Sequence, residues 1–125
     1  MGPGSAGVAA LYASFQHPEV FQQAAAQSYY TIAPADEKLP EMIGAEGDKP
    51  SQVYIAWSNH DYDLGPGLRA AEASRDLLGH LNSADINVVE QVADYSPQWG
   101  GWRGQHDEIL AALFPAPEAA EEVEE

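Results

Sequence analysis

The chain has 125 residues and a formal net charge of −15, from 20 acidic and 5 basic residues. Such a surface repels nucleic acid and anionic membranes, because phosphate binding depends on Lys and Arg. The sequence contains no cysteine, which excludes disulfides, thiolate metal sites and a cysteine nucleophile. The length suits one domain with one modest core.

No apolar run approaches the ~20 residues that span a bilayer. The sequence also shows no basic segment followed by an apolar run, which is the pattern of a signal peptide. We therefore predict a cytoplasmic protein with no membrane partner and no nucleic-acid partner. The acidic surface serves solubility or reflects a salt-adapted source, since only two of the five basic residues are lysines.

The first five residues, Met-Gly-Pro-Gly-Ser, allow two interpretations. They match a common protease-site scar or linker, or they form a Gly-rich turn that leads into a helix. The segment Ala6–Phe15 is apolar nearly all round, which predicts a helix buried on most sides. His17 and Pro18 end this helix.

The next segments are less regular. Residues Gln22–Tyr30 have an alanine-rich centre that favours a helix by local propensity, whereas the resemblance described below makes their second half a strand. Ala33–Pro50 is typical of a surface connection, with one short helical candidate at Glu37–Ile43. At the far end, residues 115–125 form an acidic tail after the last helix, and we predict that it is disordered.

The segment from 51 to 114 alternates strand and helix. The apolar run Val53–Trp57 and the β-branched run Ile86–Val92 predict strands. Helical patterns run from about Pro66 to His80 and from Trp102 to Phe114. This order predicts an α/β fold in three layers, with a mostly parallel sheet flanked by helices.

Functional groups in such sheets lie at the carboxyl ends of the strands. The loops Ser58–Asp63 and Ala93–Gly101 follow the two predicted strands, so any chemistry in this half is expected there. Tyr62, Tyr95 and Trp99 are loop residues and are candidates for lining a small apolar pocket. For two further aromatic residues, Trp57 and Trp102, core packing is the favoured interpretation.

Several segments resemble one esterase family of α/β-hydrolases. Residues 9–13 (Ala-Ala-Leu-Tyr-Ala), 17–21 (His-Pro-Glu-Val-Phe) and 27–28 (Gln-Ser) are similar to a family that includes enterochelin esterase-like and feruloyl esterase-like enzymes. Residues 53–61 resemble its strand and acid loop, and residues 99–103 (Trp-Gly-Gly-Trp-Arg) the end of its histidine loop. The resemblance covers residues from about 6 to 114. It implies the C-terminal half of an α/β-hydrolase, beginning at the Gly-x-Ser-x-Gly turn that carries the nucleophile.

The resemblance also implies positions for a catalytic triad. A gapless match places the nucleophile on Gly4, while a shift by one residue places it on Ser5 and puts Pro3 where the family has Gly. The acid matches Asp61, for which an Asx turn or a cap for the following segment is the alternative. The base falls on Pro97, which has no ring nitrogen to accept a proton.

Other residues then become candidates for the missing roles. His60 and His106 are possible relocated bases, and Asp63 is a second acid candidate. The spacing of the four histidines contains no metal-ligand pair, so we expect no metal and no cofactor. These histidines are His17, His60, His80 and His106.

Three functions follow from the resemblance. The first is an esterase-like domain that no longer hydrolyses esters and acts as a binding or structural module, because Pro97 replaces the base and the nucleophile half is missing. The second is an active carboxylic-ester hydrolase that acts on a small-molecule ester with Ser5 or a serine supplied by a partner, Asp61, and a relocated His60 or His106. The third is a fragment that needs a partner half. The exposed strand edge of a half-sheet predicts a homodimer or larger homo-oligomer.

Overall fold

The computed structural model describes residues 1–30, 38–66, 69–94 and 98–117. Four parallel strands form one sheet in the order β1-β2-β3-β4. The strands are β1 (Gly2–Pro3), β2 (Gln23–Gln27), β3 (Gln52–Ser58) and β4 (Val88–Ala93). The helices are α1 (Ser5–Gln16), α2 (Lys38–Gly44), α3 (Ala70–Ser83), α4 (Trp99–Gly104) and α5 (His106–Leu113).

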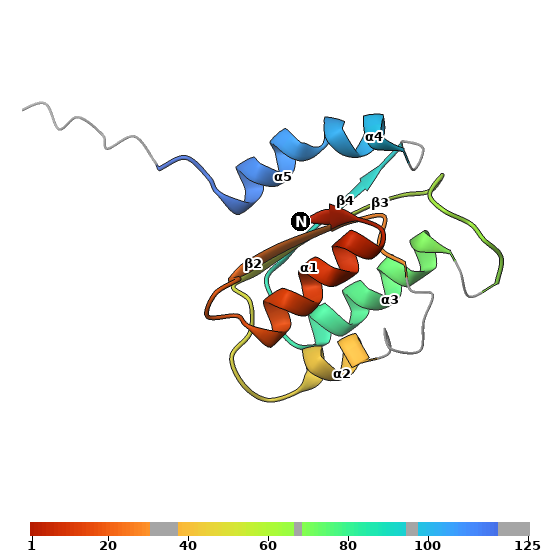
Figure 1. Cartoon of the computed structure of the whole chain (residues 1–125). Coiled ribbons are helices and arrows are strands. Elements are labelled where there is room, and N and C mark those ends of the chain that lie inside the picture. The colour runs from red at the N-terminus through yellow and green to blue at the C-terminus, as the bar shows by residue number, and fades with distance from the viewer. Residues whose placement is uncertain (31–37, 67–68, 95–97, 118–125) are drawn as a thin grey trace, which may run out of the picture.

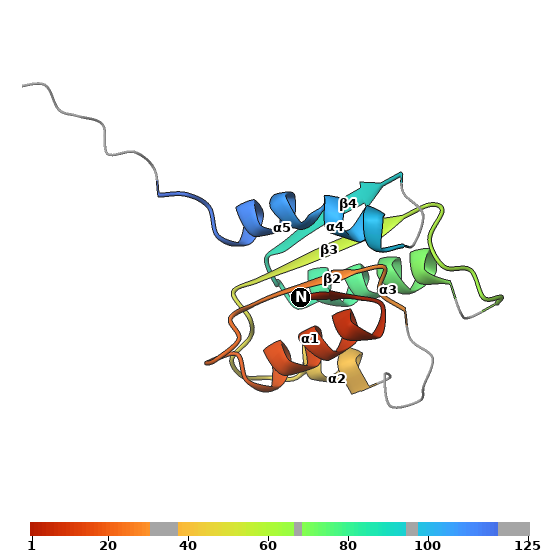
Figure 2. The same ribbon diagram turned by 45° about the horizontal axis from the view of Figure 1, so that its top comes forward.

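The helices cover both faces of the sheet. Helices α1, α2 and α3 lie on one face, and α4 and α5 lie on the other (Figures 1 and 2). Strands β2, β3 and β4 each pair in parallel with the strand that precedes them in the chain. The predicted α/β class is therefore confirmed, and among the described strands the sheet is entirely parallel.

The central strand β3 contributes side chains to two apolar cores. Val53, Ile55 and Trp57 face the larger core, which α1, α2 and α3 cover. Tyr54 and Ala56 face the smaller core, which α5 completes with Ile109 and Leu113. A strand buried on both faces is a continuous apolar run, and this pattern made β3 predictable from sequence. In the described part of the chain, no helix is long and apolar enough to cross a membrane.

Strand β2 corrects the prediction for residues 22–30. The strand occupies Gln23–Gln27, which is the first half of the segment and includes the alanines. The alanines pair with Val53–Ile55 of β3 and are buried between the two helical layers. Pairing and burial therefore outweigh the helical propensity of alanine.

Helix α1 forms where the sequence predicts it but is buried on one side only. The buried residues are Gly7, Val8, Leu11, Ser14 and Phe15. Ala6 and Ala9 are exposed, so the prediction of burial on most sides was wrong. Alanine side chains are small enough to face water at little cost. An alanine-rich apolar sequence therefore predicts more burial than the helix has.

Two helix boundaries differ from the predictions. Helix α3 begins at Ala70 rather than near Pro66. An antiparallel bridge joins Asp63 and Arg69, and the N–H of Ala70 donates to the carbonyl of Tyr62 at 2.9 Å. These contacts hold the loop in a closed turn until the helix begins.

The single predicted helix at Trp102–Phe114 is two helices, α4 and α5, which meet at Gln105. His106 is therefore the first residue of a helix rather than a residue about one turn inside it. Glycines at 100, 101 and 104 weaken a continuous helix here. The side chain of Gln105 is buried and bonds to β2, which fixes the position of the break.

The first residues of the chain are part of the sheet. Gly2 and Pro3 pair with Ala26 and Gln27, and the chain then turns into α1. A Gly-rich turn into a helix, the second interpretation of this segment, describes the structure. Of the predicted disordered tail, residues 118–125 lie outside the described part of the chain.

Two glycine substitutions test this packing. A Cβ at Gly7 would lie 2.6 Å from the carbonyl oxygen of Gly2 and 3.0 Å from Cβ of Ala26. We expect Gly7→Ala to lower the free energy of unfolding by about 1–3 kcal/mol, because the helix must move away from the sheet. Gly79 on α3 has no atom within 4 Å of the added Cβ, so Gly79→Ala is the matched control. It should raise that free energy by about 0.5–1 kcal/mol. Urea unfolding measures both, and stabilisation by Gly7→Ala contradicts the close packing of α1.

Candidate functional site

A sharp turn at Gly4 joins β1 to α1. Gly4 has φ 54° and ψ −127°, a backbone conformation that glycine adopts with little strain and other residues rarely adopt. Its N–H donates to the carbonyl of Gln27 at 2.8 Å, and its carbonyl accepts from the N–H of Val8 at 3.2 Å. The turn is therefore bonded to the sheet on one side and to the helix on the other.

The strand and the helix approach each other closely around this turn. A Cβ at Gly2 would lie 2.6 Å from Cβ of Ala6, which leaves no room for a larger residue at position 2. A Cβ at Gly4 would lie 3.1 Å from a ring carbon of Tyr30. The backbone at Gly4 thus faces an aromatic side chain, and position 4 supplies no reactive group.

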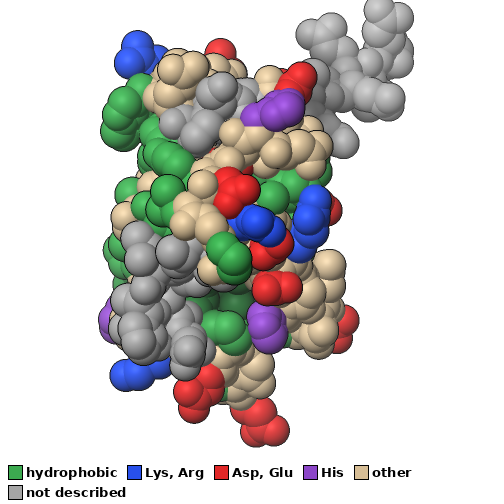
Figure 3. Space-filling view, turned by 90° about the vertical axis from the view of Figure 1, so that its right-hand side faces the viewer, with side chains coloured by type: hydrophobic (Ala, Val, Ile, Leu, Met, Phe, Trp, Pro, Cys, Tyr) green, Lys and Arg blue, Asp and Glu red, His purple; other side chains and the backbone are tan. Residues whose placement is uncertain are grey.

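A cavity of about 340 Å³ lies in front of the turn. The segment Pro3–Ala6 bounds one side, and four aromatic side chains bound the rest: Tyr30, Tyr62, Trp99 and Trp102. Figure 3 views the molecule from the carboxyl ends of the strands, where hydrophobic side chains gather on one side of the face and charged side chains toward its centre. The predictions that Tyr62 and Trp99 line a pocket at this edge agree with the cavity. Tyr95, the third predicted lining residue, lies outside the described residues.

The four rings form a continuous series. Ring centroids are 5.4 Å apart for Tyr30 and Tyr62, 6.1 Å for Tyr62 and Trp102, and 5.4 Å for Trp102 and Trp99. Tyr30 and Tyr62 are half-buried, Trp102 is 6% exposed and Trp99 is 64% exposed, so the series passes from a buried ring to the surface at its Trp99 end. Trp102 is buried, as the favoured interpretation of core packing requires, and it also lines the cavity, which was the less favoured interpretation; Tyr30 was not predicted. Trp57 is also buried, in the larger core, as predicted.

Buried hydrogen bonds hold Trp102 in the wall. Its indole Nε1 donates to Oγ of Ser28 at 2.9 Å, and its carbonyl accepts from Nε2 of Gln27 at 2.9 Å. The same Gln27 nitrogen donates to Oε1 of Gln105 at 2.9 Å. Ser28 has φ 51°, a left-handed backbone conformation at the end of β2. These residues link β2 to the junction of α4 and α5 beneath the cavity.

The loop that carries Tyr62 is shaped by Asp61. The Asp61 carboxylate accepts from the N–H of Ser58 at 3.1 Å and from the N–H of Tyr62 at 3.0 Å. These N–H groups lie three residues before and one residue after Asp61, so its carboxylate shapes the loop without forming the i to i+2 bond of the Asx turn that was an alternative reading. Burial, followed by the nearby Tyr30 and the charge of Asp61, raises the pKa of Tyr62, so its hydroxyl is neutral at pH 7.

The predicted catalytic residues lie in different places. Ser5 is the first residue of α1, is exposed and lines the cavity. His60 Nε2 lies 2.9 Å from a carboxylate oxygen of Asp94, and both side chains are exposed. His106 begins α5 and is half-buried. Among the described residues, no hydrogen bond joins Ser5 to a histidine.

Pro97, the predicted position of the family's base, lies outside the described residues. Asp63, the second acid candidate, pairs with Arg69 and not with a histidine. No cluster of three or more His, Cys, Asp or Glu side chains in the described part of the chain has the geometry of a metal site.

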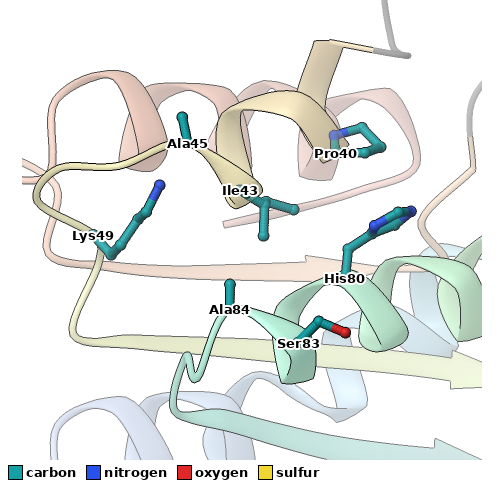
Figure 4. Close-up of a pocket in the computed structure, with 8 residues that line it drawn as sticks. Pro40, Ile43, Ala45, Lys49, His80, Ser83 and Ala84 are labelled. Carbon is teal, nitrogen blue, oxygen red and sulfur yellow. The ribbon is translucent and has the colours of Figure 1, made fainter.

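A second cavity of about 230 Å³ lies between α2 and α3. Figure 4 shows Lys49 and His80 at opposite ends of it, with Ile43 between them. Lys49 Nζ donates to the carbonyl of Met42 at 2.9 Å, at the carboxyl end of α2. Ser83 Oγ donates to the carbonyl of Gly79 at 2.9 Å. Because these polar atoms already bond to helix ends, this cavity is the weaker candidate.

No protein-family model matches this sequence, and no curated protein shows significant similarity to it. The function therefore has to be argued from the geometry of the cavity at the carboxyl ends of the strands.

The ion pair between Asp63 and Arg69, next to Tyr62, can be tested by titrating Asp63. The N–H of Gly65 and then the guanidinium of Arg69 lower the pKa of Asp63. At pH values above the ordinary pKa of Asp, the ionised carboxylate therefore stabilises the folded loop. This stabilisation is lost as the pH falls through the lowered pKa that Asp63 has in the folded protein. We expect Arg69→Met to raise the pKa of Asp63 but to leave it below the ordinary value, because the Gly65 bond remains. Carbon-detected NMR titration measures this, with Arg103→Met as the control. An unchanged pKa in Arg69→Met means that the pair does not form in solution.

Proposed function

We propose that this chain is an esterase-like α/β-hydrolase domain that binds a small molecule and does not hydrolyse esters. One observation carries the proposal: Gly4 occupies the sharp strand-to-helix turn, with φ 54° and ψ −127°, and has no side chain. In α/β-hydrolases the nucleophilic serine sits on such a strained turn, with small residues around it.

Other features support this assignment. The residues that pack around the turn are small: Gly2 against Ala6, and Gly7 against Ala26. In its gapless match, the sequence resemblance puts the nucleophile on Gly4, and it puts the base on Pro97. Acyl transfer requires a nucleophile and a general base within hydrogen-bond reach of each other. Gly4 has no side chain to act as a nucleophile, and Pro97 has no group to act as a general base.

The cavity remains suited to binding. Its volume of about 340 Å³ lies within the range of about 300–1,000 Å³ that is typical of small-molecule sites. Its walls are mainly aromatic, and Trp102 is fixed by buried hydrogen bonds to Ser28 and Gln27. A small ester is one molecule that such a cavity accommodates without cleavage.

An active ester hydrolase is the second candidate, and the observation in its favour is that Ser5 lines the same cavity. It requires Asp61 and a relocated histidine as partners. Asp61 instead accepts two backbone N–H groups of its own loop, and His60 pairs with Asp94. The geometry therefore favours the inactive domain.

Labelling with a fluorophosphonate, followed by peptide mass spectrometry, separates the two candidates, because this probe reacts with activated serines whatever their substrate. We expect no saturable labelling of any serine in the folded protein, with a known serine esterase as the positive control. Saturable labelling of Ser5 that disappears in Ser5→Ala establishes the active hydrolase instead. Labelling of Ser28, Ser58 or Ser96 also contradicts the proposal and moves the nucleophile elsewhere.

We also propose that two copies pair through the edge of β2. Strand β1 covers only Ala26 and Gln27, so residues 23–25 have no strand on that side among the described residues. Phe21, which precedes β2, is 49% exposed. Phe114 is 66% exposed and lies at the same end, because the Gln23 side chain donates to the carbonyl of Leu113. A second copy offers an identical open edge and the same apolar side chains.

Light scattering across concentrations tests this assembly. We expect a dimer that strengthens as salt rises, because salt screens the repulsion between two chains of net charge −15. Phe21→Glu together with Phe114→Glu should give a monomer, since both place charge at the edge. Leu64→Glu alters an equally exposed residue in the Tyr62 loop and should leave the dimer intact. A monomer in the unaltered protein at every concentration contradicts the proposal.

A further inference from the structure

We infer that the aromatic cavity takes a small organic cation, a quaternary or tertiary ammonium compound of about the size of choline. The inference rests on the proposed binding function and adds the chemical class of the ligand. It depends on the arrangement of the rings and on the charges around the cavity.

Four aromatic rings line the cavity, and two of the neighbouring pairs meet at large angles. Trp99 and Trp102 meet edge to face at an interplanar angle of 90°, and Tyr30 and Tyr62 meet at 62°. In an edge-to-face pair, the ring that contributes its edge keeps both faces free of that partner. The face of an aromatic ring carries the negative part of its quadrupole and attracts ammonium groups. Several rings at large mutual angles around one cavity therefore favour a cation.

The charges near the cavity point the same way. No Lys or Arg is among the described residues that line it. Asp61 lies beside Tyr62 in the chain and accepts its N–H, and its charge adds to burial and to Tyr30 in raising the pKa of the Tyr62 hydroxyl. The whole chain carries a net charge of −15. This field attracts a cation to the cavity and disfavours an anion.

The turn at Gly4 also borders the cavity, next to Tyr30, and bears on the orientation of the ligand. The amino end of α1, from Ser5, bounds the cavity there and carries a partial positive charge. An ammonium group is therefore directed away from Ser5 and toward the rings. Trp99 is the most exposed of these rings, so we expect it to cover the bound cation at the mouth of the cavity.

The decisive comparison is between choline and 3,3-dimethylbutan-1-ol, which has the same shape with carbon in place of the charged nitrogen. We expect choline to bind about tenfold more tightly than the neutral alcohol, measured by titration calorimetry of the full chain at low salt. Trp99→Leu keeps an apolar side chain but removes the π face, and should weaken choline binding about tenfold while changing the alcohol little. Leu110→Ala, on an exposed apolar residue that is not among the lining residues of the cavity, is the control. Circular dichroism confirms that each variant is folded.

Each other outcome overturns a defined part of the argument. Equal affinity for the two compounds, with both weakened by Trp99→Leu, identifies an apolar pocket; the cation inference fails and the binding function stands. Choline binding that Trp99→Leu leaves unchanged places the cation elsewhere on the acidic surface, which also overturns the inference. Binding of neither compound removes the cavity as a site for such cations. Fluorophosphonate labelling of Ser5 overturns the inactive domain whichever compound binds.

Discussion

The left-handed turn at Gly4 is the constraint on which the carboxyl edge of the molecule depends. It carries the chain from β1 into α1 within one residue, and it holds because its N–H bonds to Gln27 of the neighbouring strand. Glycine at positions 2 and 7 lets the helix lie close to the sheet. The amino end of α1 is thereby held next to Tyr30, where it bounds the cavity. A residue with a Cβ at position 4 meets both backbone strain and the ring of Tyr30.

The part of the wall that Trp102 forms depends on a buried polar network. Gln27 and Ser28, at the end of β2, bond to Trp102 and Gln105 across the sheet edge. A typical hydrogen bond contributes only about 1 kcal/mol net to stability, and two buried atoms of this network, Gln27 Oε1 and Gln105 Nε2, have no protein partner among the described residues. Its main effect is therefore geometric: it breaks the last helix at Gln105 and turns the Trp102 ring toward the cavity.

The sequence predicted what depends on local pattern. Strand β3 and helix α1 have clear apolar signatures, and Tyr62 and Trp99 follow strands whose carboxyl ends share one edge. Strand β2 was misplaced, because three alanines become a strand only through pairing with Val53–Ile55 and burial on both faces. The break between α4 and α5 depends on Gln27 and Gln105, which are 78 positions apart. The dihedral angles of Gly4 were not predictable either, since Gly-Pro-Gly-Ser has the same composition in a linker as in a strained turn.

The charges of the chain bear on hydrolysis and binding in opposite directions. Ester hydrolysis develops negative charge on an oxygen, which an active site must stabilise with donors and positive charge. Here no Lys or Arg is among the described lining residues, Asp61 acts on Tyr62 in the wall, and the net charge is −15. The partial charge at the amino end of α1 is the one favourable contribution among these features. The same field stabilises a cation held against the rings of Trp99 and Trp102. The missing side chain at Gly4 and the electrostatics of the cavity therefore favour the same function, binding without turnover.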